Sequence, residues 1–324
     1  MRLTVACADY DRTRPIIDGR VPIEGCDTSI HCLDHEDMFV RALTSAEFDV
    51  TELSFSRFAL NTARGTTPYI GLPVFLSRIF RHSAVYIRTD RGIREPGDLR
   101  GKSIGVRDYA NTASLVARGI LEDDYGLSAR EVRWIVGDID HAERDEIRLP
   151  ELAPGFDVHV APAGRLLSEM LADGEIDGLI DFQPPRCFVE GNAAVGRLFP
   201  DHQSAERDYF GRSGIFPIMH VLVLRREIAE REGWVAESLY RAFAKAKDMA
   251  VADLWSPGAL KISLPWVSEE YRRTVDLMGG DFWPYGIAAN RTAIESIARY
   301  IHSQGLAPRR LGIEELFAQS VLTT

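Results

Sequence analysis

A cluster of cationic and hydroxyl side chains comes just before an apolar run in the first third of the chain. Arg78, Arg81 and His82 lie within residues 77–83, and residues 84–87 are apolar. Arginine carries a permanent, planar charge that matches a carboxylate. Histidine is the side chain whose unperturbed pKa lies near neutral pH. This combination predicts a site that binds an anion and moves a proton.

A second histidine also precedes an apolar run. His220 ends the segment 216–220, and residues 221–224 are apolar. If the two apolar runs are adjacent strands of one fold, His82 and His220 can face one pocket. His220 has a structural alternative, as a core histidine whose ring nitrogens are bonded by the backbone.

Further polar residues stand at predicted ends of strands and at the start of a helix. Arg12 and Arg14 directly follow the first predicted strand, and open α/β sheets bind ligands at that end of their strands. The free backbone N–H groups of a helix that begins after Asn111 suit a carboxylate. Surface ion pairs and ordinary helix caps are the structural alternatives. The residues predicted to contact an anionic ligand are Arg12, Arg14, Ser54, Arg78, Arg81, Ser83, Asn111, Thr112 and Arg186.

The segment 31–37 contains residue types that ligate metals, namely histidine, cysteine and carboxylates. Strand alternation would point His31 and Cys32 to opposite faces. Asp34 and Asp37 are explained by capping of the next helix. We therefore interpret this segment as structural. The sequence contains no HExxH, P-loop, dinucleotide fingerprint or GxSxG motif, so we expect no cofactor.

The composition is that of a globular chain, with 324 residues, 45% hydrophobic residues and a net charge of −10. The acidic balance argues against nucleic-acid or anionic-membrane binding, which needs an extended basic surface. The four cysteines form no CxxC pair, so we expect reduced thiols. No apolar run approaches the roughly 20 residues of a membrane span, and the first residues do not read as a signal peptide. We therefore expect a cytoplasmic location.

Predicted strands and helices alternate along the chain, which favours an α/β fold with mainly parallel sheets. The segment 207–214 is predicted to be an irregular crossing. Strands are predicted at 3–8, 28–33, 48–53, 84–87, 103–106, 131–136 and 178–182, and helices at 36–43, 113–123, 165–172, 234–255 and 292–303.

Two α/β lobes account for this order. We predict that residues 1–88 and 215–324 form the first lobe with the C-terminal helices, and that residues 89–214 form a second lobe inserted in it. This arrangement matches the type II periplasmic-binding-protein architecture, in which the ligand lies in a cleft between the lobes.

Motifs spread over nearly the whole chain carry a family resemblance. The chain resembles the 4,5-dihydroxyphthalate decarboxylase family, whose fold is that of a binding protein turned to catalysis. The resemblance implies loss of CO2 from a hydroxylated aromatic dicarboxylate, giving protocatechuate. It rests on residues 9–15 with 18–19, residues 47–54, residues 73–75 with 77–83, Tyr109 with 112–113, residues 214–220, and residues 283–286 with Asn290.

The chemistry of that reaction gives the candidate residues roles. Direct loss of CO2 would leave an unstabilised aryl anion, so protonation of the ring carbon first, assisted by a para hydroxyl, is the easier path. We predict that His82 or His220 is the acid, and that the other histidine or Glu52 helps to deprotonate the phenol. The predicted arginines would hold the carboxylates.

Three alternatives stay open. The first is a noncatalytic cytosolic binding or sensor protein for a dicarboxylate. The second is a metal-assisted decarboxylase with His82, His220 and a carboxylate such as Glu52 as ligands. The third is another lyase or hydrolase acting on a related ring acid. In the preferred interpretation the partner is a small anionic aromatic substrate, and a homo-oligomer is left open.

Overall fold

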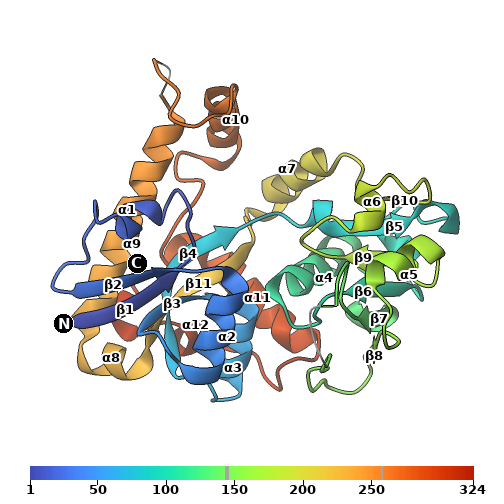
Figure 1. Cartoon of the computed structure of the whole chain (residues 1–324), viewed down its shortest axis with the longest axis horizontal. Helices are drawn as coiled ribbons and strands as arrows, with labels where there is room; N and C mark the ends of the chain where they lie inside the picture. The colour runs from blue at the N-terminus through green and yellow to red at the C-terminus, as the bar shows by residue number, and fades with distance from the viewer. Residues whose placement is uncertain (143–145, 257) are drawn as a thin grey trace. The chain divides into compact units, whose positions relative to one another are not determined.

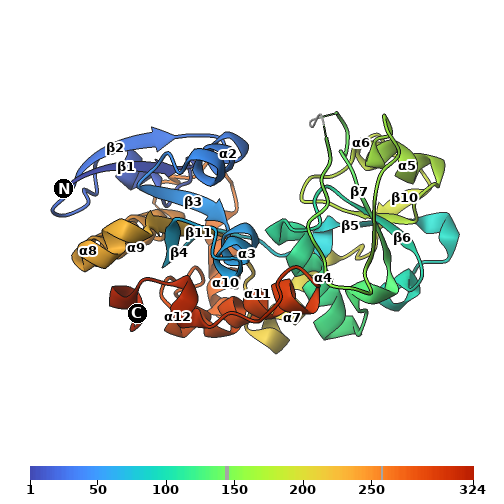
Figure 2. The ribbon, with the colours of Figure 1, turned by 90° about the horizontal axis from the view of Figure 1, so that it is seen from below.

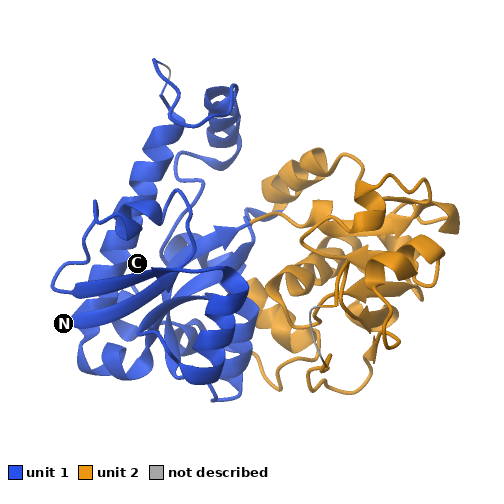
Figure 3. Cartoon of the chain, in the orientation of Figure 1, with its two compact units in different colours: residues 1–78, 213–295, 311–324 blue, residues 79–212, 296–310 orange. Residues whose placement is uncertain are grey.

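The computed structural model describes residues 1–142, 146–256 and 258–324, which form two compact units. Unit 1 contains Met1–Arg78, Ser213–Glu295 and Leu311–Thr324 (Figures 1 and 3). Unit 2 contains Ile79–Arg212 and Ser296–Arg310. Both chain ends belong to unit 1, as Figure 3 also shows, and Figure 2 gives the same ribbon seen from below. The two segments of the second unit are therefore both inserted in the sequence of the first.

Unit 1 is built on a five-stranded mixed sheet with the order β2-β1-β3-β11-β4. Strand β1 is parallel to β2 and β3, whereas β11 is antiparallel to β3 and β4. Buried apolar side chains fill most positions of β1, β4 and β11, as expected where helices cover a sheet. The central strand β3 also buries Thr51, Glu52 and Ser54. The strands are β1 (Arg2–Cys7), β2 (Asp27–Cys32), β3 (Val50–Ser54), β4 (Tyr69–Arg78) and β11 (Ile218–Arg225). The helices are α1 (Arg14–Ile17), α2 (His35–Ser45), α3 (Phe55–Ala63), α8 (Arg226–Arg231), α9 (Gly233–Leu254), α10 (Val267–Met278) and α12 (Ile313–Leu316).

Unit 2 is built on a six-stranded sheet with the order β10-β5-β9-β6-β7-β8. Strands β6, β7, β8 and β9 are parallel, and β5 is antiparallel to both of its neighbours. The strands are β5 (Val85–Arg88), β6 (Ser103–Val106), β7 (Arg133–Val136), β8 (Asp157–Val160), β9 (Gly178–Ile180) and β10 (Val195–Arg197). The helices are α4 (Thr112–Tyr125), α5 (Leu167–Asp173), α6 (Arg186–Val189) and α7 (His202–Ser213), and the end of α11 (Arg291–Ser303) also belongs to this unit.

The α/β class is confirmed, and most of the predicted elements are present with shifts of a few residues at their ends. The prediction for residues 207–214 is wrong, because residues 202–213 form the helix α7. Only Tyr209 of this helix is buried, so the helix needs almost no apolar residues at helical spacing. The periodicity that predicts other helices is therefore missing here. Its exposed face includes Arg212, whose guanidinium lies 2.7 Å from the carboxylate of Asp124.

The boundaries of the units differ from the predicted lobes mainly at two places. Residues 79–88 and 296–310, both predicted within the first lobe, belong to unit 2. Tyr300 packs so closely on Gly119 of α4 that a Cβ there would lie 2.4 Å from its ring. Gln304 accepts a hydrogen bond from Nε of buried Arg118 (2.7 Å) and donates to the carbonyl of Leu115 (2.9 Å). Such contacts join segments about 180 residues apart, so a local sequence pattern cannot predict them.

Among the described residues, no helix combines the length and the apolar character that a membrane crossing requires.

Candidate functional site

The sheet of unit 1 brings a buried carboxylate next to His220. Glu52 lies on β3, between β1 and β11, and is 0% exposed. Ser54 is the register partner of His220 on β11, and Glu52 is two residues before Ser54. Side chains two residues apart on a strand share a face, so Glu52 and His220 project from the same side of the sheet. The register of β11 against β4 shifts on both sides of His220, an irregularity that re-aims side chains next to sites.

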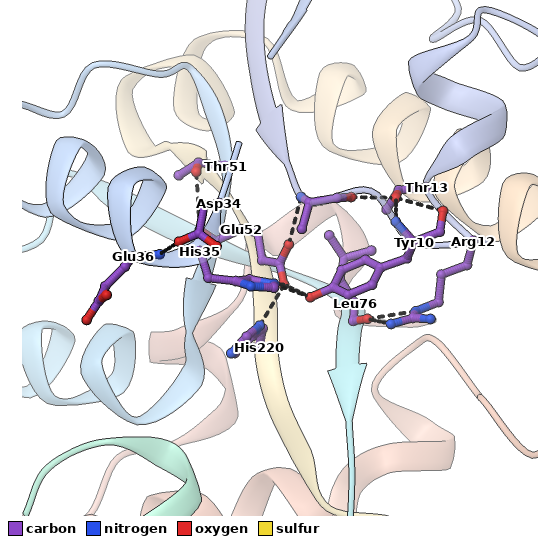
Figure 4. Close-up of polar contacts among 11 residues, drawn as sticks. Tyr10, Arg12, Thr13, Asp34, His35, Glu36, Thr51, Glu52, Leu76 and His220 are labelled. Carbon is purple, nitrogen blue, oxygen red and sulfur yellow. Dashed lines mark hydrogen bonds and ion pairs between the residues drawn. The ribbon is translucent and has the colours of Figure 1, made fainter. Parts of the chain in front are cut away.

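Hydrogen bonds from two residues converge on one oxygen of Glu52 (Figure 4). Its Oε1 accepts from Nδ1 of His220 (2.6 Å) and from the hydroxyl of Tyr10 (2.7 Å). Its Oε2 lies 3.3 Å from the backbone N–H of Ala8, which donates to it. Burial alone would raise the pKa of Glu52, but the hydrogen bond and charge of His220, with smaller contributions from His35 and Tyr10, leave it below its usual value. The carboxylate is therefore ionised at neutral pH.

Tyr10 is held in place by the turn that follows β1. Its backbone N–H donates to Oγ1 of Thr13 (2.9 Å), and that hydroxyl donates to the carbonyl of Ala8 (2.7 Å). The guanidinium of Arg12 stacks on the Tyr10 ring at 4.1 Å and on Trp283 at 4.2 Å. Burial, and then the charge of Glu52, raise the pKa of Tyr10 well above its usual value. Tyr10 therefore stays protonated and donates to Glu52.

His35, the first residue of α2, completes the cluster. Its Nε2 lies 2.5 Å from the Tyr10 hydroxyl oxygen and 3.7 Å from Oε1 of Glu52. Because the single proton of Tyr10 is donated to Glu52, Nε2 of His35 carries the hydrogen and donates to Tyr10. The His35 and His220 rings are 5.0 Å apart. We refer to Tyr10, His35, Glu52 and His220 as the Glu52 cluster.

The Glu52 cluster also contains a set of atoms that could ligate a metal. His35, Glu52 and His220 each offer one ligand atom, and these atoms lie within 4.8 Å of one another. Two imidazoles and a carboxylate suit zinc, manganese or ferrous iron. The set differs from that of the metal-assisted alternative, because His35 takes the place of His82. The structural interpretation of residues 31–37 agrees with Asp34, which accepts from the N–H of Glu36 as a helix cap, whereas His35 of the same segment bonds to Tyr10 in the Glu52 cluster.

The next predicted ligand-contacting residues of unit 1 are Arg12, Arg14 and Ser54. The two arginines donate their hydrogen bonds to acceptors within the protein. Nε of Arg12 donates to the carbonyl of Leu76 (2.7 Å), and Arg14 pairs with the exposed Asp9 (2.8 Å). Ser54 is buried at the junction of β3 and α3. These contacts give the two arginines structural partners.

Arg78 is buried at the end of β4, and burial lowers its pKa to about 9. It donates to the carbonyl of Phe216 (2.8 Å), to that of Pro284 (2.7 Å) and to the side-chain oxygen of Asn290. All three acceptors are neutral, so this guanidinium joins β4 to the segments around Phe216 and Pro284–Asn290.

His82 lies in unit 2, and the premise that placed it beside His220 is wrong. The apolar run that follows His82 is β5 of the six-stranded sheet, whereas the run that follows His220 is β11 of the five-stranded sheet. His82 is 1% exposed, and its ring lies 5.1 Å from Phe199 and 5.3 Å from Tyr209. Neither ring nitrogen has a hydrogen-bond partner among the described residues. Burial lowers its pKa to about 4.

The remaining predicted residues also belong to unit 2. Arg81 is buried, which lowers its pKa to about 10, and the charges of Asp181 and Glu206 oppose this shift. The N–H of Ser83 donates to Glu206 (3.3 Å). Asn111 caps α4 by accepting from the N–H of Ser114 (2.7 Å), and Thr112 is buried in the first turn. Arg186 lies near Glu169 (3.6 Å) and Glu190 (4.0 Å).

Two members of the Glu52 cluster, Tyr10 and His35, received no role from the sequence. A usable signal was present. Tyr10 follows β1 and His35 follows β2, and these strands are parallel neighbours whose carboxyl ends meet at one edge of the sheet. The rule that led to Arg12 therefore applies equally to Tyr10 and His35.

No protein-family model matches the chain. The chain is 43% identical over 320 residues to a 4,5-dihydroxyphthalate decarboxylase from Comamonas testosteroni, with 98% of this chain and 96% of that protein covered. It is also 43% identical over 210 residues to a 4,5-dihydroxyphthalate decarboxylase from Pseudomonas putida, with 65% of this chain and 81% of that protein covered.

Solved structures resemble the chain in fold. The periplasmic aliphatic sulphonate-binding protein SsuA from Escherichia coli matches with a TM-score of 0.54 at 12% identity, covering 100% of this chain and 99% of that chain. The alkanesulfonate-binding protein SsuA from Xanthomonas axonopodis pv. citri matches with a TM-score of 0.51 at 14% identity, covering 98% and 97%. The chain thus has the two-lobed α/β fold of periplasmic binding proteins.

Proposed function

The chain belongs to the 4,5-dihydroxyphthalate decarboxylase family, and from this premise we propose that it converts 4,5-dihydroxyphthalate into protocatechuate and CO2. Membership of the family makes the chain an enzyme. The identity of 43% over nearly the full length of the Comamonas testosteroni relative supports the substrate. The Glu52 cluster supports the reaction type, because it supplies positioned proton carriers.

We propose that His220 protonates the ring carbon that bears the departing carboxylate. The observation that carries this role is the 2.6 Å hydrogen bond between Nδ1 of His220 and the fully buried Glu52 carboxylate. An ionised carboxylate stabilises the protonated imidazole and fixes its ring. The other nitrogen, Nε2, has no hydrogen-bond partner among the described residues, so it is free to face the substrate.

The arrangement of Arg12 fits a reaction in which CO2 must leave. A guanidinium that bound the reacting carboxylate tightly would stabilise the substrate more than the transition state. The Nε of Arg12 instead donates to the carbonyl of Leu76, and its plane supports the Tyr10 ring. We therefore propose that Arg12 positions Tyr10. Residues Arg81, Ser83, Asn111, Thr112 and Arg186 remain proposed contacts for the substrate carboxylates.

The test is to mix purified protein with 4,5-dihydroxyphthalate, with and without a chelator, and to follow CO2 release and product absorbance. We expect turnover that survives the chelator. Loss of turnover that zinc or manganese restores would instead make His35, Glu52 and His220 metal ligands, as their spacing allows. Saturable binding of the compound without CO2 release would contradict the proposed function and favour a binding protein.

A further inference from the structure

We propose that His35 is the base that takes the proton of the substrate's para hydroxyl while His220 protonates the ring carbon. This inference rests on the proposed function, and it assigns the two halves of the proton transfer to two histidines of one cluster.

The two rings are mounted as a pair. Their centroids are 5.0 Å apart and their planes are tilted by 55°. The Phe39 ring packs on both of them, at 6.0 Å from His35 and at 5.1 Å from His220. His220 bonds directly to Glu52, whereas His35 reaches Glu52 through the hydroxyl of Tyr10. One carboxylate thereby orients both imidazoles.

Each imidazole uses one nitrogen inside the cluster and keeps the other free. His220 uses Nδ1 and His35 uses Nε2. Nε2 of His220 and Nδ1 of His35 have no hydrogen-bond partner among the described residues, and neither is a buried orphan atom. The side chains are 19% and 40% exposed, respectively. Both free nitrogens can therefore meet a small molecule from solvent.

The charges divide the roles. Two imidazolium ions 5.0 Å apart repel each other, so the pair does not readily hold two extra protons. His220 has the direct bond to the ionised carboxylate, whereas His35 is bonded to a neutral phenol. The groups that face His35 are Glu52 from β3, His220 from β11, Tyr10 from the turn after β1, and Asp34 at its own helix cap. Nε2 of His35 donates to Tyr10, so its Nδ1 keeps the lone pair that a base needs. The direct bond to the carboxylate therefore favours His220 as the acid, and the free Nδ1 favours His35 as the base.

The reaction requires two such groups at separate places. A base removes the hydroxyl proton, and the electron pair moves through the ring to the para carbon, which bears the carboxylate. That carbon takes a proton from Nε2 of His220, and its bond to the carboxylate then breaks. The released electron pair restores the aromatic ring as a phenolate, which takes its proton back from His35. CO2 leaves, and the one proton consumed is resupplied to His220 from solvent.

The experiment compares the pH dependence of kcat/KM for the wild type, His35→Gln and His31→Gln. His31→Gln is the matched control, because His31 lies on β2 outside the Glu52 cluster. For the wild type we expect a bell-shaped profile. In His35→Gln we expect kcat to fall by about 10²-fold or more and the acidic limb, which reports the base, to disappear while the alkaline limb stays. His31→Gln should behave as the wild type.

A rescue experiment separates a base from a merely structural residue. A 4,5-dihydroxyphthalate with fluorine next to the hydroxyl has a more acidic phenol and needs the base less. The deficit of His35→Gln should therefore shrink with this compound if its Tm matches that of the wild type.

Three results would overturn the inference. One is a wild-type kcat and pH profile in His35→Gln, and another is an equal deficit with both substrates. The third is a stoichiometric metal in the wild type that His35→Gln lacks, since His35 would then be a ligand. Absence of turnover in the wild type would instead count against the proposed function, so the two failures are distinguishable.

Discussion

His220 and His82 have similar sequence surroundings but opposite environments in the structure. Both come just before an apolar run of the sequence, although His220 itself lies within β11 and His82 lies in the turn before β5. His220 bonds to a buried carboxylate 168 positions away in the sequence and keeps one nitrogen free. His82 lies between Phe199 and Tyr209 in unit 2, where neither nitrogen has a partner among the described residues. The local sequence context is thus shared, and the difference lies in which distant segments contact the ring.

The difference matters because a proton donor must first hold a proton. A carboxylate stabilises imidazolium, whereas an apolar enclosure opposes it. The pKa of His82, lowered by burial to about 4, leaves this ring neutral over the physiological range. His220 has the surroundings of an acid, and His82 has those of a core residue.

The largest expected effect comes from breaking the Glu52 cluster. We expect Glu52→Gln and His220→Gln each to lower kcat by about 10²–10⁴-fold, because each removes part of one proton donor. The double variant should be about as slow as the slower single variant, since residues that act as a unit are not additive. The measurement is kcat for the three variants with Tm as the check on folding. Glu47→Gln, whose carboxylate is exposed and pairs with Arg41, is the matched control.

Additive losses would show that Glu52 and His220 act independently. Unchanged kcat in both single variants would remove the assignment of His220 as the acid.

Much of the fold could be predicted because its signals are local. The strand at 3–8 and the helix at 234–255 follow from apolar periodicity, and both are present as β1 and α9. The strand order was not accessible in this way. The prediction that β5 and β11 are adjacent is wrong, because they belong to different sheets. Both runs are apolar, and neither sequence indicates which sheet the strand joins.

The next largest effect is expected from replacing Arg78. This change distinguishes a role in substrate binding from a role in the stability of the fold. Its guanidinium donates to Phe216, Pro284 and Asn290, so Arg78→Met leaves buried acceptors unsatisfied. We expect the free energy of unfolding to fall by about 3 kcal/mol, as for loss of hydrogen bonds from a charged group. Chemical denaturation measures this change. Arg14→Met is the control for stability, because Arg14 pairs with Asp9 on the surface.

The alternative is that Arg78 holds a substrate carboxylate. A large rise in KM with unchanged stability would establish that role and contradict the structural one.

The site could be predicted in part. Glu52, His220 and Arg12 were selected from strand ends, and Glu52 and His220 do meet, because their positions depend on the β3 and β11 pairing. Tyr10 and His35 were missed because a tyrosine after a strand and a histidine at a helix start have ordinary structural explanations. Their contacts with Glu52 depend on the pairing of β1 with β2 and β3. This pairing is set by the whole sheet and cannot be read from the local sequence.

The smallest expected effect concerns the stability of the protein in acid and tests the environment of His82. Its pKa is 6.5 when unfolded and about 4 in the structure, so between these values the unfolded chain binds more protons and stability falls as the pH falls. At pH 5 this cost is about 2 kcal/mol, and above pH 7 it vanishes. His82→Leu removes it, so the stability of this variant relative to the wild type should rise by about 2 kcal/mol between pH 7 and pH 5 in denaturant titrations. At pH 7 its kcat should equal that of the wild type. A kcat loss as large as that of His220→Gln, or a stability difference independent of pH, would mean that His82 holds a proton after all and that the contrast between the two histidines is false.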